Sequence, residues 1–344
     1  LLFEKSENRI SSLYTVKKVY PMLDPDLSEN LFSLREGFDR PVLTFEVQVA
    51  ENGEIGATQI YRSVINVNQN LSYELVDEDI NRDDPYWTEV FRFCQRLKEK
   101  RIENGSLELE RIEIKLDISD PDSIQIKEIR ENTPASTLIQ ELAIHTNHQA
   151  ASFCRQHGLL CLFRNQPPYS INKGLAEGEK PTLQDIQIQP ARIGTSPEGH
   201  SALGLDCYLQ VTSPIRRFLD LVNQGIIFSH LADIESGYDS DELLTWARQG
   251  EDIQREYAAI ERSLERHWKI KYLAQHQDDI FDAQMVRTLR NGKSLINIQQ
   301  VQLFVECVLD EVPEGTFQIV LDLVTPKYVR VVVRPYFEET ASDK

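Results

Sequence analysis

The hydrophobic pattern of the chain changes near residue 276, and this change limits the fold more than any other feature. Upstream, segments with helical periodicity are mixed with strand-like segments. Downstream, about five short strand-like runs occupy roughly 60 residues, which is typical of a small barrel such as the OB-fold. The sequence therefore predicts an α+β chain of two domains: a core of mixed sheet and helices over residues 1–275, and an OB-like β-barrel over residues 276–344.

Capping and turn signals divide the first domain further. Ser72 is a good cap for a short helix, and Thr133-Pro134 begins a long helix that ends at Gly158. Residues 165–200 are rich in proline, glycine and polar side chains, which indicates a loop or lid. We also expect a hairpin over 41–67, a helix over 87–101 and a strand pair over 107–126. Further along, a strand over 205–211 leads into a helix that opens at Ser213-Pro214, and a helical hairpin follows over about 240–275.

Charge and cysteine content argue against several classes of protein. Lys and Arg number 37 against 55 Asp and Glu, so the net charge of −18 would repel a polyanion unless basic residues were concentrated locally. No apolar run approaches the roughly 20 residues of a membrane-spanning helix. The five cysteines include no Cys-x-x-Cys pair, so their spacing suggests neither a zinc site nor a disulfide framework and fits a reducing cytoplasm.

The most informative stretch is Thr212-Ser213-Pro214-Ile215-Arg216-Arg217-Phe218-Leu219-Asp220-Leu221. Ser213 is a good helix cap and Pro214 favours a first helical turn, so unpaired backbone N–H groups would lie beside two arginines. Such a helix start suits a bound phosphate. The alternative is an ordinary capped helix whose arginines pair with Asp220 or with solvent.

This stretch resembles the signature of the ribonuclease II and ribonuclease R family, in which an RNB-type catalytic core precedes an OB-fold. The resemblance covers residues 1–275 and implies processive 3′-to-5′ hydrolysis of single-stranded RNA to nucleoside 5′-monophosphates, assisted by Mg²⁺. It is supported, in chain order, by Pro21-Met22-Leu23, Arg62-Ser63-Val64-Ile65, Leu71-Ser72-Tyr73, Gly105-Ser106-Leu107, Leu138-Ile139-Gln140-Glu141 with Asn147, and Gly204-Leu205.

The resemblance also implies roles for particular residues. Arg216 would clamp the scissile phosphate, while Tyr73 and Glu261 would contact the terminal nucleotide. Judged without the family, Tyr73 is better explained by packing, and Glu261 by a solvated position on a helix. Further substrate contacts are implied for Thr212, Ser213, Arg217, Gln140, Glu141 and Leu109.

Departures from the family pattern bear on activity. Gln140 stands where the family usually has an acid, and Leu109 where an aromatic side chain would stack on a base, a contact worth about 1–3 kcal/mol. The aspartates that hold Mg²⁺ in the family are expected upstream of residue 1, so no metal ligand is assigned within the chain. Its own acidic run, which reads as a solvated linker, comprises Asp77, Asp79, Asp83 and Asp84.

An exoribonuclease is therefore the main hypothesis, and a catalytically inactive RNA-binding protein with an RNB fold is the alternative; a structural scaffold is a third reading. The expected partner is single-stranded RNA, with no membrane and no obligate protein partner. The expected location is the bacterial cytoplasm, with a plastid as the alternative. An RNA channel would be lined by basic clusters at 98–101, 216–217, 262–271 and 327–334.

Overall fold

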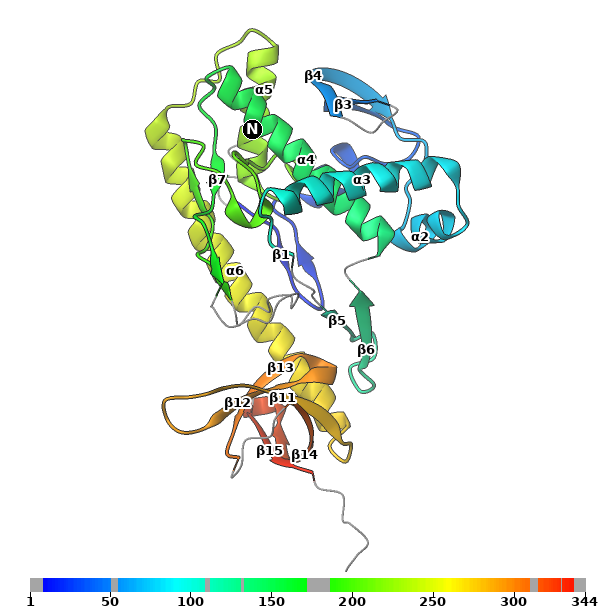
Figure 1. Ribbon diagram of the computed structural model, residues 1–344, viewed down its shortest axis with the longest axis vertical. Helices are drawn as coiled ribbons and strands as arrows, with labels where there is room; N and C mark the ends of the chain where they lie inside the picture. The colour runs from blue at the N-terminus through cyan, green and yellow to red at the C-terminus, as the bar shows by residue number, and fades with distance from the viewer. Residues whose placement is uncertain are drawn as a thin grey trace, which may run out of the picture. The chain divides into compact units, whose positions relative to one another are not determined.

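The computed structural model describes residues 9–50, 55–108, 112–130, 133–171, 186–309, 315–328 and 330–336 (Figure 1). The chain forms two compact units. The first comprises Leu1–Leu13, Tyr20–Arg111 and Glu131–Glu256, and the second comprises Tyr14–Val19, Ile112–Arg130 and Tyr257–Lys344. One boundary between the two units falls inside a helix, between residues 256 and 257. The domain limits expected from the sequence, 1–275 and 276–344, stay a prediction.

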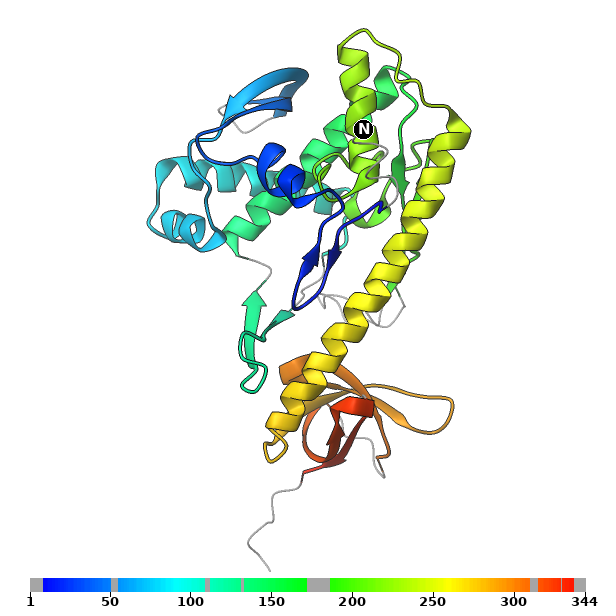
Figure 2. The ribbon, with the colours of Figure 1, turned by 180° about the vertical axis from the view of Figure 1, so that it is seen from behind.

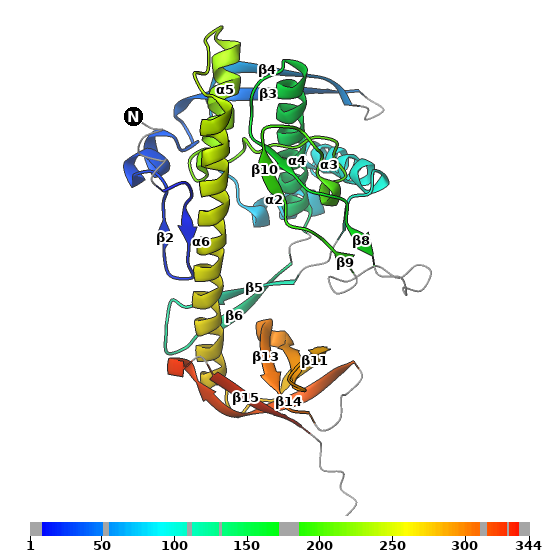
Figure 3. The same ribbon diagram turned by 90° about the vertical axis from the view of Figure 1, so that its left-hand side faces the viewer.

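The first unit is built mainly from helices. Two of them begin as the sequence predicts, because Ser72 and Thr133 each accept a hydrogen bond from a backbone N–H of the first turn. Asp84, expected from the sequence to lie in a solvated linker, caps the helix that starts at Pro85, two residues before its predicted start. Helices α3 and α4 lie side by side (Figure 3). The helices with most or all of their residues in this unit are α2 (Tyr73–Asn81), α3 (Pro85–Glu103), α4 (Pro134–Gln156) and α5 (Phe218–Leu231), with a π-helical turn at Asp26–Leu31 and a 3-10 turn at Ser201–Leu203.

The strands associated with this unit form antiparallel pairs. The expected hairpin over 41–67 is present as β3 (Asp39–Val49) and β4 (Ile55–Asn66). The predicted loop over 165–200 contains short strands in its described part, while residues 172–185 lie outside the described residues. The remaining pairs are β7 (Phe163–Asn165) with β10 (Arg192–Gly194), and β8 (Ser170–Ile171) with β9 (Ile186–Gln187). A short pair of β1 (Leu13–Tyr14) with β2 (Val19–Tyr20) has residues in both units.

One hydrophobic core holds the first unit together and fixes the segment before α5. Phe163, Leu209 and Phe218 are fully buried there, together with Ile227 of α5 and Leu243. Burial of such side chains is the main favourable term in folding. The predicted strand over 205–211 is observed only as isolated bridges, from Leu205 to His200 and from Leu209 to Phe163.

The second unit contains the expected small barrel. Five antiparallel strands, labelled in Figure 1, follow the order β13-β12-β11-β14-β15, and this nearly closed sheet fits an OB-like fold. Ile296, Ile298 and Ile319 fill its interior. The strands are β11 (Phe281–Thr288), β12 (Ser294–Ile298), β13 (Leu303–Cys307), β14 (Thr316–Thr325) and β15 (Arg330–Pro335); the separate pair is β5 (Ile112–Asp117) with β6 (Gln125–Arg130), and the 3-10 turns are Gln299–Val301 and Pro326–Tyr328. The predicted α+β class is confirmed.

Two helix predictions were wrong. The segment over 240–275 is one continuous helix, α6 (Ser240–Gln275), rather than a helical hairpin (Figure 2). It contains no proline, and Gly250 packs against Leu219 instead of forming a turn. Helix α5 begins at Phe218 rather than at Ser213-Pro214, because Arg217 is extended. Among the described residues, no helix combines the length and the apolar character needed to cross a membrane.

Candidate functional site

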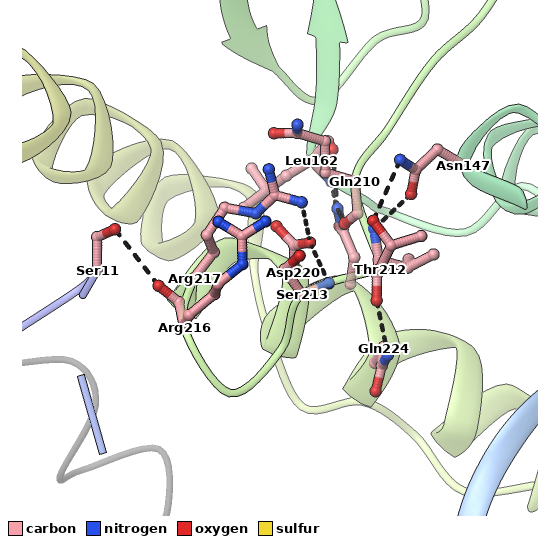
Figure 4. A network of polar contacts seen from close by, with 12 residues as sticks. Ser11, Asn147, Leu162, Gln210, Thr212, Ser213, Arg216, Arg217, Asp220 and Gln224 are labelled. Atoms are coloured by element: carbon pink, nitrogen blue, oxygen red, sulfur yellow. Dashed lines mark hydrogen bonds and ion pairs between the residues drawn. The ribbon is translucent and has the colours of Figure 1, made fainter. Parts of the chain in front are cut away.

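The segment that leads into the arginine turn is held by side-chain amides from two helices (Figure 4). On α4, Asn147 accepts the Val211 N–H at 2.9 Å and donates to the Tyr208 hydroxyl at 3.0 Å. On α5, Asn223 donates to the carbonyl oxygen of Gln210 at 3.1 Å, and Gln224 donates to that of Val211 at 2.7 Å. Both asparagines are almost fully buried. The backbone over 208–211 therefore has little freedom to move.

The arginine turn itself, residues 213–217, is anchored by Asp220. This carboxylate is 1% exposed and accepts the Ser213 N–H at 2.9 Å and the Arg217 Nη2 at 2.7 Å (Figure 4). Burial raises the pKa of Asp220, while the neighbouring Arg217 acts in the opposite direction. The Ser213 carbonyl accepts the N–H groups of Arg216 and Arg217 at 3.2 and 3.0 Å. Asp220 thus fixes both the backbone and one guanidinium group.

Arg216 differs from Arg217 in having an exposed side chain. Its backbone carbonyl accepts the Ser12 N–H at 3.0 Å and the Ser11 hydroxyl at 3.4 Å. Among the described residues, its guanidinium makes no hydrogen bond or ion pair. Of the two arginines that the sequence left as possible partners of Asp220, only Arg217 pairs with it. Arg216 has a fixed backbone, and the donors of its guanidinium are free for a ligand.

Arg164 on β7 is a cation that the sequence did not single out. Burial lowers its pKa, Tyr208 raises it, and the charge of Arg217 lowers it further. The only sequence signal was an arginine at the end of the apolar run Leu159-Leu160-Cys161-Leu162-Phe163. Arg217 is also incompletely satisfied, because its buried Nε has no partner among the described residues. Both cations add positive potential near the turn.

Glu141 has a clear structural partner. It is 2% exposed, and its Oε2 and Oε1 accept from Arg101 Nε and Nη2 at 2.9 and 2.5 Å. The same guanidinium donates to the Ser106 hydroxyl at 2.9 Å and the Leu203 carbonyl at 3.3 Å. The pair therefore joins α4 to α3 and to the 201–203 turn. Its neighbour Gln140 is exposed on α4.

The model of the RNB domain family matches residues 1–187 and 179–233. The chain belongs to the RNB domain family. This confirms the resemblance to ribonucleases II and R. An uncharacterized ribonuclease of Synechocystis, sll1290, is 25% identical over 310 residues, covering 87% of this chain and 46% of the relative.

Solved structures agree on the fold. RNase R of Mycoplasma genitalium, in complex with ribose-methylated single-stranded RNA, aligns with a TM-score of 0.82 at 17% identity, covering 97% of this chain and 64% of that one. Yeast Ssd1, described as a pseudonuclease, aligns with a TM-score of 0.70 at 18% identity, covering 93% of this chain and 45% of that one. The chain spans half or less of the length of the curated relatives it matches first.

The other residues assigned from the RNB resemblance occupy different surroundings. Tyr73 begins α2 and is 52% exposed. Thr212 is exposed, and its hydroxyl accepts from Asn147 at 3.5 Å, whereas Ser213 is buried. Glu261 belongs to the second unit, where its Oε1 accepts the Tyr14 N–H at 3.0 Å. Leu109 lies outside the described residues. The substrate contacts of these residues stay predictions.

The basic clusters expected to line a channel are partly neutralised by ion pairs. Lys98 pairs with Glu108, Lys269 with Glu265, and Arg334 with Asp322. These three pairs, like Arg101 with Glu141 and Arg217 with Asp220, offset a positive charge locally. Arg216 is consequently a more useful indicator of an anion site than the count of basic residues.

The described residues do not form a site that suits Mg²⁺, which prefers an octahedron of oxygen ligands. Their one group of at least three close His, Cys, Asp or Glu donors contains a histidine and a cysteine. In the acidic run, Asp77 accepts the Ala135 N–H at 2.7 Å and Asp84 caps α3. These two aspartates serve helix starts.

Proposed function

We propose that this RNB chain is the RNA-holding part of an exoribonuclease that hydrolyses single-stranded RNA from the 3′ end to nucleoside 5′-monophosphates. The exposed guanidinium of Arg216 on a fixed backbone is the observation that carries the proposal. The fold shared with M. genitalium RNase R, which was solved with single-stranded RNA, supports it. A reducing compartment such as the bacterial cytoplasm suits the five free cysteines.

In this proposal, Arg216 binds the scissile phosphate. A planar guanidinium can donate to two phosphate oxygens at once, and the Arg216 backbone is already ordered by Ser11, Ser12 and Ser213, so little backbone freedom is lost on binding. Donors placed where negative charge develops commonly contribute about a hundredfold to a thousandfold in rate. Asp220 acts as a positioning residue, because it holds the turn and keeps Arg217 beside it.

The remaining assigned residues would position the substrate. Tyr73 is exposed enough to lie against the terminal nucleotide, and Glu261 would contact that nucleotide. Thr212, Ser213, Arg217, Gln140 and Leu109 would contact other parts of the RNA. Glu141 would act on the RNA indirectly, through the Arg101 pair that fixes α4 under Gln140.

Exoribonucleases of the RNB family generally depend on a divalent metal, and we propose Mg²⁺ with carboxylate ligands outside residues 1–344. When bound, such an ion polarises the phosphate and activates water. The described carboxylates of this chain do not provide that cage, so the chain by itself is expected to bind RNA without shortening it.

The experiment uses the protein expressed from its complete gene, 5′-labelled single-stranded RNA and Mg²⁺. We expect stepwise shortening from the 3′ end that EDTA abolishes. Arg216→Ala and Arg216→Lys should both lower turnover by roughly a hundredfold or more at unchanged melting temperature, with a modest loss of RNA affinity. Arg192→Ala, at an exposed arginine on β10, is the control. Normal cleavage per folded molecule in both Arg216 variants would remove Arg216 from the active site.

A catalytically inactive RNA-binding protein is the second candidate. Gln140 and Leu109 depart from the family pattern, and the likeness to Ssd1, described as a pseudonuclease, joins the chain to a non-catalytic relative. The same experiment separates the two functions. Salt-sensitive binding of single-stranded RNA with no shortening at any Mg²⁺ concentration would identify the binding protein.

A further inference from the structure

The first unit contains a cavity of about 480 Å³ that the proposed ribonuclease function does not use. Its wall is formed by the end of α3, by α4, by the segment after β7 and by the turn that precedes Tyr208. The polar residues of interest in that wall are His148 and Asp206, and Tyr169 closes one side by donating from its hydroxyl to the Gly105 carbonyl at 3.0 Å. Cys207 follows Asp206 directly and is fully buried.

Three different donor atoms lie close together here: those of His148 and Asp206, which line the cavity, and that of the buried Cys207, which does not. His148 Nε2 lies 3.0 Å from Asp206 Oδ1, and Cys207 Sγ is within 4.8 Å of both. Around a tetrahedral zinc ion, with bonds of about 2.0–2.3 Å, neighbouring ligand atoms lie about 3.3–3.6 Å apart. The observed spacing is therefore close to that of a tetrahedral site, and shifts of about an ångström would complete it.

Neighbouring side chains orient two of these donors. Arg155 Nη1 donates to Asp206 Oδ2 at 2.8 Å, which leaves Oδ1 directed toward His148. The Ser152 hydroxyl lies 3.5 Å from Cys207 Sγ. Hydrogen bonds of this kind, from groups just outside a metal's own ligands, commonly orient those ligands. The carboxylate supplies one negative charge, which it shares with Arg155. Burial raises the pKa of the Cys207 thiol, so the second charge would form when a cation binds and displaces the proton.

We propose that His148, Asp206 and Cys207 form a site for a zinc-class divalent cation whose fourth position opens to the cavity. One nitrogen, one oxygen and one sulfur ligand favour such a cation over Mg²⁺. The sequence spacing hid the site, because His148 is separated from Asp206 by 58 positions and no second cysteine lies near Cys207 in the sequence. The site stands independently of the proposed exoribonuclease function.

Co²⁺ alone is the first probe, since a thiolate bound to Co²⁺ gives a charge-transfer absorption band in the near ultraviolet. The full chain is titrated under reducing conditions, and Zn²⁺ affinity is then measured by displacement. The variants are His148→Ala, Asp206→Asn and Cys207→Ser. Cys154→Ser is the matched control, because Cys154 Sγ lies 3.0 Å from Cys161 Sγ and this buried pair of thiols is a second place that could capture the ion.

We expect one equivalent of Co²⁺ to give the band, Cys207→Ser to abolish it, and Cys154→Ser to retain it. His148→Ala and Asp206→Asn should weaken Zn²⁺ binding at least tenfold. Loss of a group that only orients a metal ligand already lowers metal affinity by about 10–100-fold, and loss of a ligand should cost at least as much. Zn²⁺ should raise the melting temperature of the unmodified chain and of Cys154→Ser alone.

His148→Ala and Asp206→Asn alter partly exposed side chains, so they keep the test decisive if Cys207→Ser fails to fold. The absence of a band, or a band that both of these variants retain at full affinity, would overturn the proposal. A band lost in Cys154→Ser and kept in Cys207→Ser would assign the ion to the Cys154–Cys161 pair instead. In either case the His148–Asp206–Arg155 contacts would be a polar network that needs no metal.

Discussion

Glu141→Gln is expected to destabilise the first unit strongly. The substitution keeps the size of the side chain but removes its charge, leaving the Arg101 guanidinium, whose side chain is 11% exposed, without a carboxylate. Breaking a buried ion pair from one side costs about 3–5 kcal/mol. For a unit of this size, each kcal/mol corresponds to about 2–4 °C, so the melting temperature should fall by roughly 6 °C or more.

Thermal and urea unfolding of the purified chain measure the effect, and Gln140→Ala on the exposed side of α4 is the control. Replacing both partners, as Arg101→Met with Glu141→Leu, should recover part of the loss, since an apolar pair leaves no buried charge unpaired. A Glu141→Gln chain that melts within about 1 °C of the unmodified chain but binds single-stranded RNA much more weakly would refute this reasoning. That result would favour the direct contact between Glu141 and RNA that the family resemblance implies.

Three further outcomes are expected. Gly204→Ala should destabilise more than Gly237→Ala, because both have positive φ but an added Cβ at Gly204 would lie 2.5 Å from the Arg101 carbonyl, whereas the space at Gly237 is open; equal melting temperatures would contradict this. Burial lowers the pKa of His145 and of His200 from 6.5 to about 4, so above pH 6.5 both states are neutral, and between pH 6.5 and 4 only the unfolded chain binds the protons. The free energy of unfolding should therefore decrease as the pH is lowered from 6.5 to 4, as measured by urea unfolding. His145→Leu should make this dependence on pH less steep; an unchanged dependence would argue against a buried neutral His145. Affinity for single-stranded RNA should decrease with salt and exceed that for duplex of equal length, and equal affinities would reject a single-strand channel.

Local signals were sufficient for most of the fold. Ser72 and Thr133 cap helices because their hydroxyls reach N–H groups three residues away, and that distance is fixed by the helix itself. The five strands of the barrel follow from alternation within each strand. The start of α5 failed because a distant segment pairs with Arg217 and extends it, which no signal within the Ser213-Pro214 neighbourhood could show.

The candidate site was only partly predictable, because its side chains come from segments that are far apart in the sequence. The family resemblance selected Arg216 and Arg217, but only the fold shows that Asp220 holds one and leaves the other free. Glu141 was assigned to RNA from the family resemblance, and its pairing with Arg101 went unseen because the two residues are 40 positions apart in the sequence. Arg164 and the cluster at His148 were missed because each depends on side chains brought together by the core of the first unit.

The hydrogen bonds that complete the arginine turn also impose an order in time. Phe218 donates to the Ile10 carbonyl and Ser12 to the Arg216 carbonyl, which joins segments about 205 positions apart. During synthesis the segment over residues 10–12 emerges early and lacks these partners until residue 218 has left the ribosome. Closing so long a loop is entropically costly, so the turn should form late in folding. The nascent chain would thus complete the arginine turn, the surface that we propose binds phosphate, only after the surrounding core could support it.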